Sequence, residues 1–361
     1  MKDNSMKVTP GRYIQGKGVC TQLGDELRKL NVSRVYLLGG ERAMAQVMPI
    51  AETSLKDSGI SYETGIFKGF TTYENVQFHM QCAQSFNAEM IIGIGGGKSI
   101  DCAKATAHLM NKPVGTIPTS LATCVACSNV VIMYSNSGAY IDPIFPDNSI
   151  EFSLVDMDII AHAPSRYIAS GIVDSMAKYP ELRFSQRETH FCSEINDACL
   201  QAAYGMSHST WDILMENGRQ AYMDNQNAII SHCLEAVAST NLLTTGAISG
   251  LARGSKQLAI AHAVYNHSTV LFPDTWREYM HGEIVSVGVL LQELYNEAPA
   301  EEIENFKKIV TDLHVPLYLH EIGIDPTSEN QEKLYRALLS QFTQFTEAEQ
   351  KRLRECIERI K

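Results

Sequence analysis

One stretch of the sequence joins a short apolar run to a cluster of glycines and a lysine. Residues 90–94 read MIIGI, and Gly95-Gly96-Gly97 and Lys98 follow at once, ahead of residues with helical spacing. Glycines lack a Cβ and let backbone N–H groups approach a phosphate, and a following helix N-terminus adds the positive end of its dipole. The pattern predicts a phosphate-binding turn between a buried strand and a helix, with a tight turn that binds nothing as the alternative.

Two familiar phosphate loops do not fit these residues. A Walker A loop needs glycine at position 92, where Ile92 stands. The pattern G-x-G-x-x-G, read from Gly93, needs glycine at position 98, where Lys98 stands. The turn is therefore a phosphate cradle of another type.

The whole stretch from Gly95 to Lys104, GGGKSIDCAK, matches the motif GGGxxxDxAK and resembles the iron-containing alcohol dehydrogenases, particularly their glycerol dehydrogenase-like branch. Residues 117–124, IPTSLATC, look like the proline-threonine loop of that family. The resemblance runs from about residue 8 to about residue 300 with its motifs in order. It implies an NAD(P)-linked dehydrogenase with dehydroquinate synthase-like architecture.

The resemblance also implies which residues hold NAD or NADP. They are Gly39, Gly40, Glu41, Gly95, Gly96, Gly97, Lys98, Asp101, Thr116, Thr119 and Thr123. At the end of the first predicted strand, Glu41 suits a ribose 2′-hydroxyl, whereas Arg42 and the space beside the glycines suit a 2′-phosphate. The choice between NAD and NADP stays open at this point.

One carboxylate and two imidazoles are the metal ligands that the resemblance implies. They are Asp174, His262 and His281, which match the family positions. Such a set with an open position suits Zn²⁺ first and Fe²⁺ second. Residues 272–274 (FPD) break any helix between the two histidines, which must therefore come from different helices. A lone histidine is more often a core or surface residue, so the prediction rests on the set.

The proton relay departs from the family pattern. Relatives often have a histidine three residues after the first metal histidine, and this chain has Tyr265 there. His267 is the candidate extra ligand or acid-base group, but it lies about 140° round the helix from His262 and need not face the site.

The substrate prediction rests on Cys124. The resemblance places an aspartate that contacts the polyol at this position in glycerol dehydrogenases, whereas relatives that reduce 2-oxo acids carry cysteine. The sequence therefore favours a 2-hydroxy acid/2-oxo acid pair over glycerol and dihydroxyacetone.

Two alternative classes of protein stay open. One is a dehydroquinate synthase-like lyase, for which no ring of basic residues accompanies His262 and His281. The other is a non-catalytic nucleotide-binding protein, which would not need the metal ligands. A redox role for Cys124 and Cys127 is disfavoured by their place after a proline-threonine loop.

Two kinds of element must position these residues. Short apolar runs at 34–38, 90–94, 114–117 and 152–155 alternate with helical patterns at 41–58 and 73–87, and residues 130–134 and 139–141 flank a turn-forming cluster and read as a hairpin. After residue 164 the sequence becomes a series of amphipathic helical segments, at 165–179, 191–217, 224–252, 256–267, 280–297, 300–313, 329–342 and 346–360. We expect an α/β NAD(P)-binding domain over residues 1–163 with a parallel sheet, and an all-helical metal-binding domain over residues 164–361.

Composition restricts the partners. The net charge of -11, with no basic run, argues against nucleic acid, and no apolar stretch is long enough for a membrane span. Nine scattered cysteines do not form a secreted disulfide framework. A cytoplasmic enzyme with a small-molecule substrate is expected, and the resemblance implies a homo-oligomer, either a dimer or an octamer.

Overall fold

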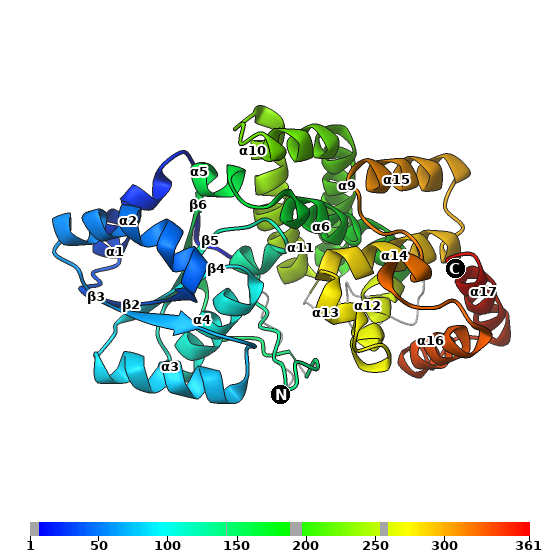
Figure 1. Cartoon of the computed structure of the whole chain (residues 1–361), viewed down its shortest axis with the longest axis horizontal. Helices are drawn as coiled ribbons and strands as arrows, with labels where there is room; N and C mark the ends of the chain where they lie inside the picture. The colour runs from blue at the N-terminus through cyan, green and yellow to red at the C-terminus, as the bar shows by residue number, and fades with distance from the viewer. Residues whose placement is uncertain (1–6, 142, 188–196, 253–258) are drawn as a thin grey trace.

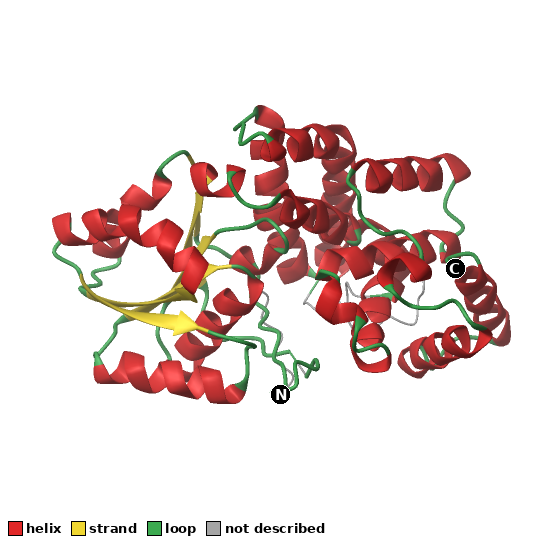
Figure 2. Ribbon diagram, viewed as in Figure 1, coloured by secondary structure: helices red, strands yellow, loops and turns green. Residues whose placement is uncertain are grey.

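A parallel sheet with its covering helices forms one end of the molecule, and a helical half forms the other (Figure 1, Figure 2). The computed structural model describes residues 7–141, 143–187, 197–252 and 259–361. No strand follows the sixth one in these ranges. The expected class, a parallel α/β part followed by a helical part, is confirmed.

The sheet has six strands in the order β1-β6-β5-β4-β2-β3, and every neighbouring pair is parallel. The strands are β1 (Arg12–Gly16), β2 (Arg34–Gly40), β3 (Ser61–Phe67), β4 (Met90–Gly95), β5 (Val114–Pro118) and β6 (Ile150–Asp156). The covering helices are α1 (Leu23–Lys29), α2 (Glu41–Asp57), α3 (Tyr73–Ser85) and α4 (Gly97–Met110).

Alternate residues of β2 show how the sheet is covered. Val35 and Leu37 join the apolar core with α1 and α2, and Tyr36 and Leu38 join the core with α3 and α4. This follows from the two-residue period of a strand buried on both faces. Figure 1 accordingly shows α1 and α2 on one side of the sheet and α3 on the other.

The direction of the chain reverses between β2 and β4. From β2 the chain passes through α2 to the edge strand β3, whereas from β4 it passes through α4 to β5 on the other side. In open parallel sheets, ligands bind beyond the carboxyl ends of the strands at such a reversal. The glycine turn after β4 lies at this point.

Helices make up the second half. They are α5 (Met157–Ala161), α6 (Ser165–Met176), α7 (Lys178–Arg187), α9 (Asp197–Gln226), α10 (His232–Ser239), α11 (Thr245–Leu251), α12 (Ile260–Leu271), α13 (Thr275–Glu278), α14 (His281–Tyr295), α15 (Ala300–Asp312), α16 (Ser328–Gln341) and α17 (Glu347–Glu358). A π-helical turn, Thr240–Thr244, joins α10 to α11. The α5 helix contacts both the sheet, at β1 and β6, and the helical half, at α9. No described helix is long and apolar enough to cross a membrane.

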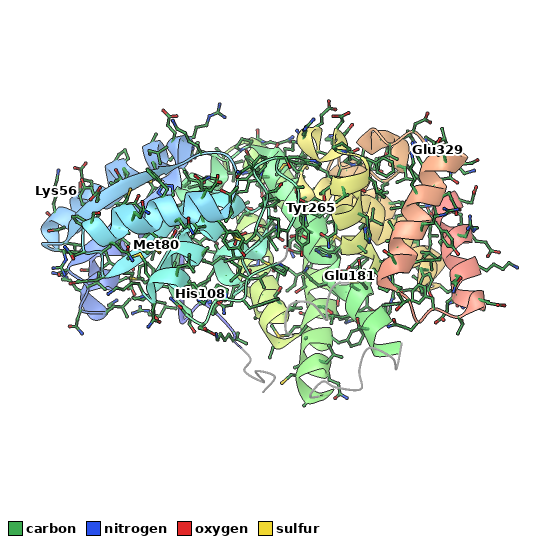
Figure 3. All side chains as sticks on the ribbon, turned by 90° about the horizontal axis from the view of Figure 1, so that it is seen from below. Lys56, Met80, His108, Glu181, Tyr265 and Glu329 are labelled. Carbon is green, nitrogen blue, oxygen red and sulfur yellow. The ribbon has the colours of Figure 1, made fainter. Side chains whose placement is uncertain are left out.

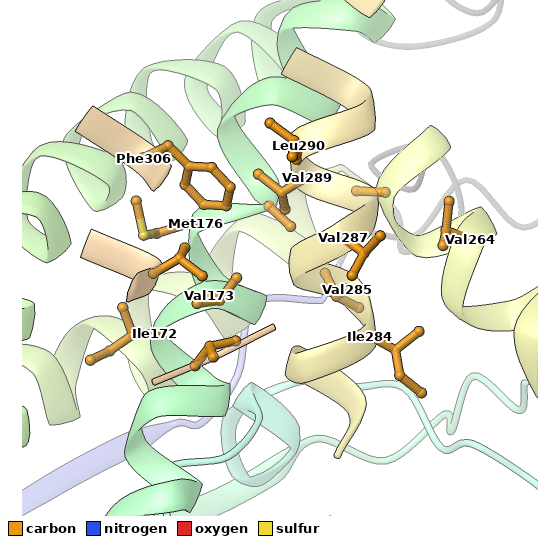
Figure 4. Close-up of a cluster of buried hydrophobic side chains, with 14 of the residues drawn as sticks. Ile172, Val173, Met176, Val264, Ile284, Val285, Val287, Val289, Leu290 and Phe306 are labelled. Carbon is orange, nitrogen blue, oxygen red and sulfur yellow. The ribbon is translucent and has the colours of Figure 1, made fainter. Parts of the chain in front are cut away.

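The core of the helical half surrounds α14, which is buried from Gly282 to Tyr295. Figure 4 shows side chains of this helix meeting Ile172, Val173 and Met176 of α6, with Phe306 of α15 close by. A helix that is apolar on all sides belongs in the centre of a bundle. The core therefore fixes α14, which begins with a predicted metal ligand.

Several elements differ from those that the sequence predicts. The hairpin predicted over 130–141 is present only as a short antiparallel pairing, with the N–H of Ile141 bonded to Met133 and an isolated bridge between Tyr134 and Tyr140, and it forms no extended ladder. Two backbone N–H groups of the first segment are bonded elsewhere and cannot join a ladder. The N–H of Ile132 donates to Asp101, and the N–H of Tyr134 donates to the carbonyl of Thr71. The helix expected over 224–252 starts only at His232, after Ala228 adopts a left-handed conformation with φ 52°. The edge strands β1 and β3 were not predicted.

Candidate metal and dinucleotide site

Three potential metal ligands from three helices meet in the helical half. Asp174 comes from α6, His262 from α12 and His281 from the first position of α14. The Oδ1 atom of Asp174 lies 3.2 Å from Nε2 of His262 and 3.1 Å from Nε2 of His281. One ligand atom of each residue lies within 4.8 Å of the other two, and Asp174 and His262 are buried.

A second carboxylate orients His262. Oε2 of Glu181, on α7, lies 2.7 Å from Nδ1 of His262, and Oε1 accepts the backbone N–H groups of Ala259 and His262. Burial raises the pKa of Glu181, but the charge and hydrogen bonds of His262 outweigh it, and the pKa falls below its ordinary value. An ionised carboxylate only accepts, so Nδ1 carries the proton and Nε2 is left to face Asp174.

The donor set fits a cation. With Nδ1 of His262 protonated, the lone pair of Nε2 faces the lone pairs of Asp174 Oδ1, and His281 adds a third group. Burial raises the pKa of Asp174, but its interactions with His281 and His262 hold it well below its ordinary value, so the carboxylate is ionised and can only accept. Convergent acceptors repel one another unless a proton or a metal ion lies between them. Two imidazoles and one carboxylate form the ligand set of many zinc and iron(II) sites.

Close glycine contacts set the positions of the ligand helices. A Cβ on Gly282, next to His281, would overlap the carbonyl of Ser170 on α6. A Cβ on Gly288 would overlap the carbonyl of Ala261, which precedes His262. Only glycine permits these approaches, so the spacing of α6, α12 and α14 depends on them.

An ion pair also fixes the start of α14. Glu283 accepts the backbone N–H of Met280 at 2.8 Å, and the guanidinium of Arg166 on α6 donates to both of its carboxylate oxygens at 2.6 Å. Paired N–H donors on one carboxylate fix direction as well as distance. The helix that carries His281 is thereby tied to the helix that carries Asp174.

Sequence reasoning missed two charged residues of this cluster. Lys178 is 4% exposed, and its Nζ lies 3.3 Å from Nε2 of His262. Lys178 and Glu181 follow Asp174 by four and seven residues, a spacing that places helical residues on one face. That spacing was the signal available in the sequence.

His267 lies apart from the cluster. Its ring is hydrogen-bonded to the side chain of Gln341 on α16, so the position round the helix turns it away from the three ligands. Tyr265 is the residue of α12 that lies beside His281, with ring centroids 4.2 Å apart and an edge-on arrangement. Its hydroxyl is hydrogen-bonded to Tyr134. Figure 3 shows Tyr265 and Glu181 near the middle of the molecule.

The glycine turn has the shape of a phosphate cradle. Gly95 has φ 125°, a conformation that side chains rarely permit, and a Cβ there would lie 2.6 Å from Oγ of Ser99. A Cβ on Gly96 or Gly97 would come no closer than about 3.5 Å to other atoms, and the nearest would be Oγ of Ser120 and Oγ1 of Thr123. The backbone of the α4 N-terminus is therefore open towards two hydroxyls. Lys98 lies over the ring of Phe70, with Nζ 4.5 Å from the centroid.

Two expected cofactor residues, Asp101 and Thr116, have side chains that point into the protein. Asp101 is buried, lies 3.0 Å from Nζ of Lys104 and accepts the N–H of Ile132. Thr116 is buried and donates to the carbonyl of Ala126. Nζ of Lys104 donates to three carbonyls of the same loop, those of Val125, Ser128 and Val130. These side chains hold the loop that follows β5.

At the end of β2, one expected cofactor residue is packed against the sheet and two are open to solvent. A Cβ on Gly39 would lie 2.7 Å from the carbonyl of Ile94, so this glycine lets β2 and β4 approach. Gly40 has open space around it, and Glu41 begins α2 with an exposed side chain. Gly40, Glu41 and the likewise exposed Arg42 are therefore free to meet a ligand.

The proline-threonine loop connects the glycine turn to the metal cluster. The N–H of Thr119 donates to the carbonyl of Gly95, and Thr123 faces Gly97. The carbonyl of Leu121 lies against Gly171 of α6, one turn before Asp174. The charges of Asp174 and Lys178 act on the thiol of Cys124. The loop therefore spans the distance between the two predicted sites.

Comparisons with known proteins show which proteins the sequence and the fold resemble. The family described as iron-containing alcohol dehydrogenase matches residues 10–157. A glycerol dehydrogenase from Escherichia coli O6:H1 (strain CFT073) is 33% identical over 316 residues, which cover 88% of this chain and 84% of that protein. Hydroxycarboxylate dehydrogenase A from Escherichia coli (strain K12) is 26% identical over 330 residues, covering 90% and 88%. The crystal structure of glycerol dehydrogenase from Schizosaccharomyces pombe, at 24% identity, has the same fold, with a TM-score of 0.84 over 100% of this chain and 91% of that one.

Proposed function

Since this chain belongs to the iron-containing alcohol dehydrogenase family, we propose that it interconverts a small secondary alcohol and its carbonyl compound with NAD(P) and one divalent metal ion. It is a dehydrogenase that acts on CH–OH groups, and membership implies a nicotinamide cofactor and a metal. The identity of the metal, the cofactor and the substrate belongs to the proposal.

One observation carries the proposal. The proline-threonine loop lies against both predicted sites, because Thr123 faces Gly97 of the glycine turn and the carbonyl of Leu121 lies against Gly171, on the helix that carries Asp174. A dehydrogenase needs its cofactor ring and its substrate hydroxyl close together, because hydride transfer is a short-range step. A nucleotide-binding protein without catalysis has no need of this arrangement.

We assign the metal position to Asp174, His262 and His281, with Zn²⁺ as the preferred ion and Fe²⁺ as the second choice. A divalent ion held there supplies a Lewis acid, which lowers the pKa of an alcohol hydroxyl and polarises a carbonyl group. Glu181 supports this role by fixing the ring of His262, and Glu283 supports it by fixing α14.

The other residues bind and orient. The backbone of Gly96 and Gly97, with the N-terminus of α4, holds the pyrophosphate, and the hydroxyls of Thr119 and Thr123 hold the nicotinamide half. A nicotinamide cofactor held there would supply the acceptor for the hydride that the carbinol carbon of the alcohol loses in the oxidation. The hydroxyl proton leaves to solvent, so the products are a carbonyl compound, the reduced cofactor and one proton.

Two substrate classes have support. Several relatives are glycerol dehydrogenases, which favours glycerol and dihydroxyacetone over the 2-hydroxy acid that the sequence predicts. The second candidate, a 2-hydroxy acid, is supported by Cys124, a neutral side chain in the connecting loop, and by the cation of Lys178 beside the cluster. Hydroxycarboxylate dehydrogenase A is among the relatives.

The test is turnover by protein purified without a histidine tag and loaded with Zn²⁺ or Fe²⁺. NADH and NADPH are each offered with dihydroxyacetone, hydroxyacetone and pyruvate. We expect reduction of at least one carbonyl compound, and loss of both metal and turnover in Asp174→Asn, with the circular dichroism spectrum unchanged. Absence of turnover in metal-loaded protein that binds the cofactor, or full activity of a metal-free His281→Ala variant, would overturn the proposal.

A further inference from the structure

Lys178 is a buried cation beside the metal cluster to which the reaction proposed above assigns no contact. It begins α7, directly after the helix that carries Asp174, and it is 4% exposed. Among the described residues, the one hydrogen-bond partner of its ammonium is Nε2 of His262, 3.3 Å away. A lysine is almost never buried to this extent without a partner.

The partner of Lys178 is also the atom that a metal ion requires. Nε2 has a single lone pair because Nδ1 donates its proton to Glu181, so the ammonium and a metal cannot both use it. When a metal is bound, the ammonium needs another acceptor, because an unpaired buried charge is costly. Glu181 cannot fill this role easily, since its two oxygens already accept from His262 and from two backbone N–H groups.

The charges around the cluster call for an anion. Asp174 and Glu181 offset the charge of a divalent ion, and the ammonium of Lys178 then leaves the site with an excess of positive charge. The loop side chain near it, Cys124, contributes no negative charge, because burial raises the pKa of its thiol. A small molecule that carries a carboxylate next to the reacting carbon would supply both the missing acceptor and the missing charge.

We propose that Lys178 is a specificity-determining residue whose ammonium binds the carboxylate of a 2-hydroxy acid or 2-oxo acid at the metal site. This inference rests on the proposed function and selects between its two substrate classes. Removal of the charge therefore affects anionic substrates and leaves neutral ones nearly untouched.

Pyruvate and hydroxyacetone test the inference, because they share the methyl ketone and differ in a carboxylate against a hydroxymethyl group. We expect Lys178→Met to lower kcat/KM for pyruvate by about 30-fold or more, the effect of one charged hydrogen bond, and to change the value for hydroxyacetone less than about threefold. Lys178→Arg keeps the charge and is expected to retain most of the preference. Lys308→Met, at an exposed position of α15, is the matched control.

A binding measurement separates the failure of this inference from the failure of the proposed function. Oxamate has the shape and charge of pyruvate but is not reduced, and its dissociation constant is measured by calorimetry on zinc-loaded protein with NADH or NADPH. We expect Lys178→Met to bind one zinc ion and to weaken oxamate about 30-fold. An equal loss of kcat/KM for pyruvate and hydroxyacetone in Lys178→Met, or an unchanged dissociation constant for oxamate, would overturn the role of Lys178. If the native protein reduces none of pyruvate, hydroxyacetone and dihydroxyacetone, the proposed function fails, and the oxamate titration still decides on Lys178.

Discussion

At the scale of single residues, the site consists of three ligands and the side chains that fix them. Asp174 and the two histidines supply the ligand atoms, whereas Glu181 determines which nitrogen of His262 faces the metal. Glu181 is completely buried, and so is the bond it makes. Metal affinity should therefore depend on a residue that does not touch the ion.

Substitution of Glu181 tests this dependence. Glutamine keeps an oxygen that can accept from Nδ1 of His262 but removes the charge that strengthens the bond. We expect Glu181→Gln to weaken zinc binding about 10-fold to 100-fold, the usual effect of an outer-shell partner, with little change in thermal stability. Competition with a chromogenic chelator measures the affinity. Glu302→Gln, which alters a partly exposed carboxylate on α15, is the control, and equal affinities in all three proteins would refute the role.

The pH dependence of metal binding follows from His262. Burial lowers the pKa of His262, but the charge of Glu181 and the hydrogen bonds to both carboxylates outweigh burial and raise the pKa above its ordinary value. A proton and a metal ion compete for Nε2, so protonation weakens metal binding at a higher pH than for a free histidine. We expect zinc affinity to fall steadily as the pH drops from about 8 to about 6. Calorimetry in buffers of different ionisation enthalpy should detect protons released on binding, and a pH-independent affinity would contradict the assignment.

Part of this site could be predicted from the sequence through its resemblance to a family. Asp174, His262 and His281 were found because they match the positions of a family motif, and the structure brings them together. Asp101 lies in a matching motif and Thr116 directly before one, yet both point into the protein, because a motif fixes a residue and not the direction of its side chain. Glu181 and Lys178 were missed, since a buried charge is recognisable only once its partners are known.

At the scale of elements, glycine contacts decide how closely the helices approach. The contact between Gly288 and the carbonyl of Ala261 brings α14 against α12 next to His262. The helical pattern at 280–297 predicts α14, and the structure adds that this helix is buried in the centre of the helical half. The sequence could not predict the π-helical turn at Thr240–Thr244 or the edge strands β1 and β3, because tertiary contacts rather than local patterns determine them.

Gly288 and Gly205 allow a matched test of this packing. Both lie inside helices, but a Cβ on Gly205 of α9 would meet no atom within 4 Å. We expect Gly288→Ala to lower the free energy of unfolding by about 1–3 kcal/mol through overpacking and to weaken zinc binding. Gly205→Ala should instead raise the free energy of unfolding by about 0.5–1 kcal/mol, because alanine favours a helix. Denaturant unfolding measures the free energy of unfolding of both variants. A Gly288→Ala variant with native stability and native zinc affinity would show that the helices can adjust.

At the scale of the whole molecule, aromatic rings connect the sheet half to the helical half close to the cofactor turn. Phe70, in the loop between β3 and α3, meets Trp276 of α13 edge to ring, with centroids 5.6 Å apart. Gly138 fits against both rings, since a Cβ there would overlap Trp276. Lys98 of the glycine turn lies over the other side of this group, on Phe70. The same rings thus contact both halves and the turn expected to bind phosphate.

A double-mutant cycle on Phe70 and Trp276 asks whether the halves are energetically coupled. An aromatic pair contributes about 0.5–1.5 kcal/mol beyond the area it buries, so Phe70→Ala and Trp276→Ala together should cost less than the sum of the single changes by about that amount. The stacked pair of Trp211 and Phe306, which lies wholly in the helical half, gives the reference coupling within one half. If the sheet half and the helical half unfold independently, the changes in the free energy of unfolding caused by Phe70→Ala and Trp276→Ala will add, and two thermal transitions will appear. A single transition with a coupling near that of the reference pair would mean that loss of structure in one half opens the cofactor turn and the metal cluster together.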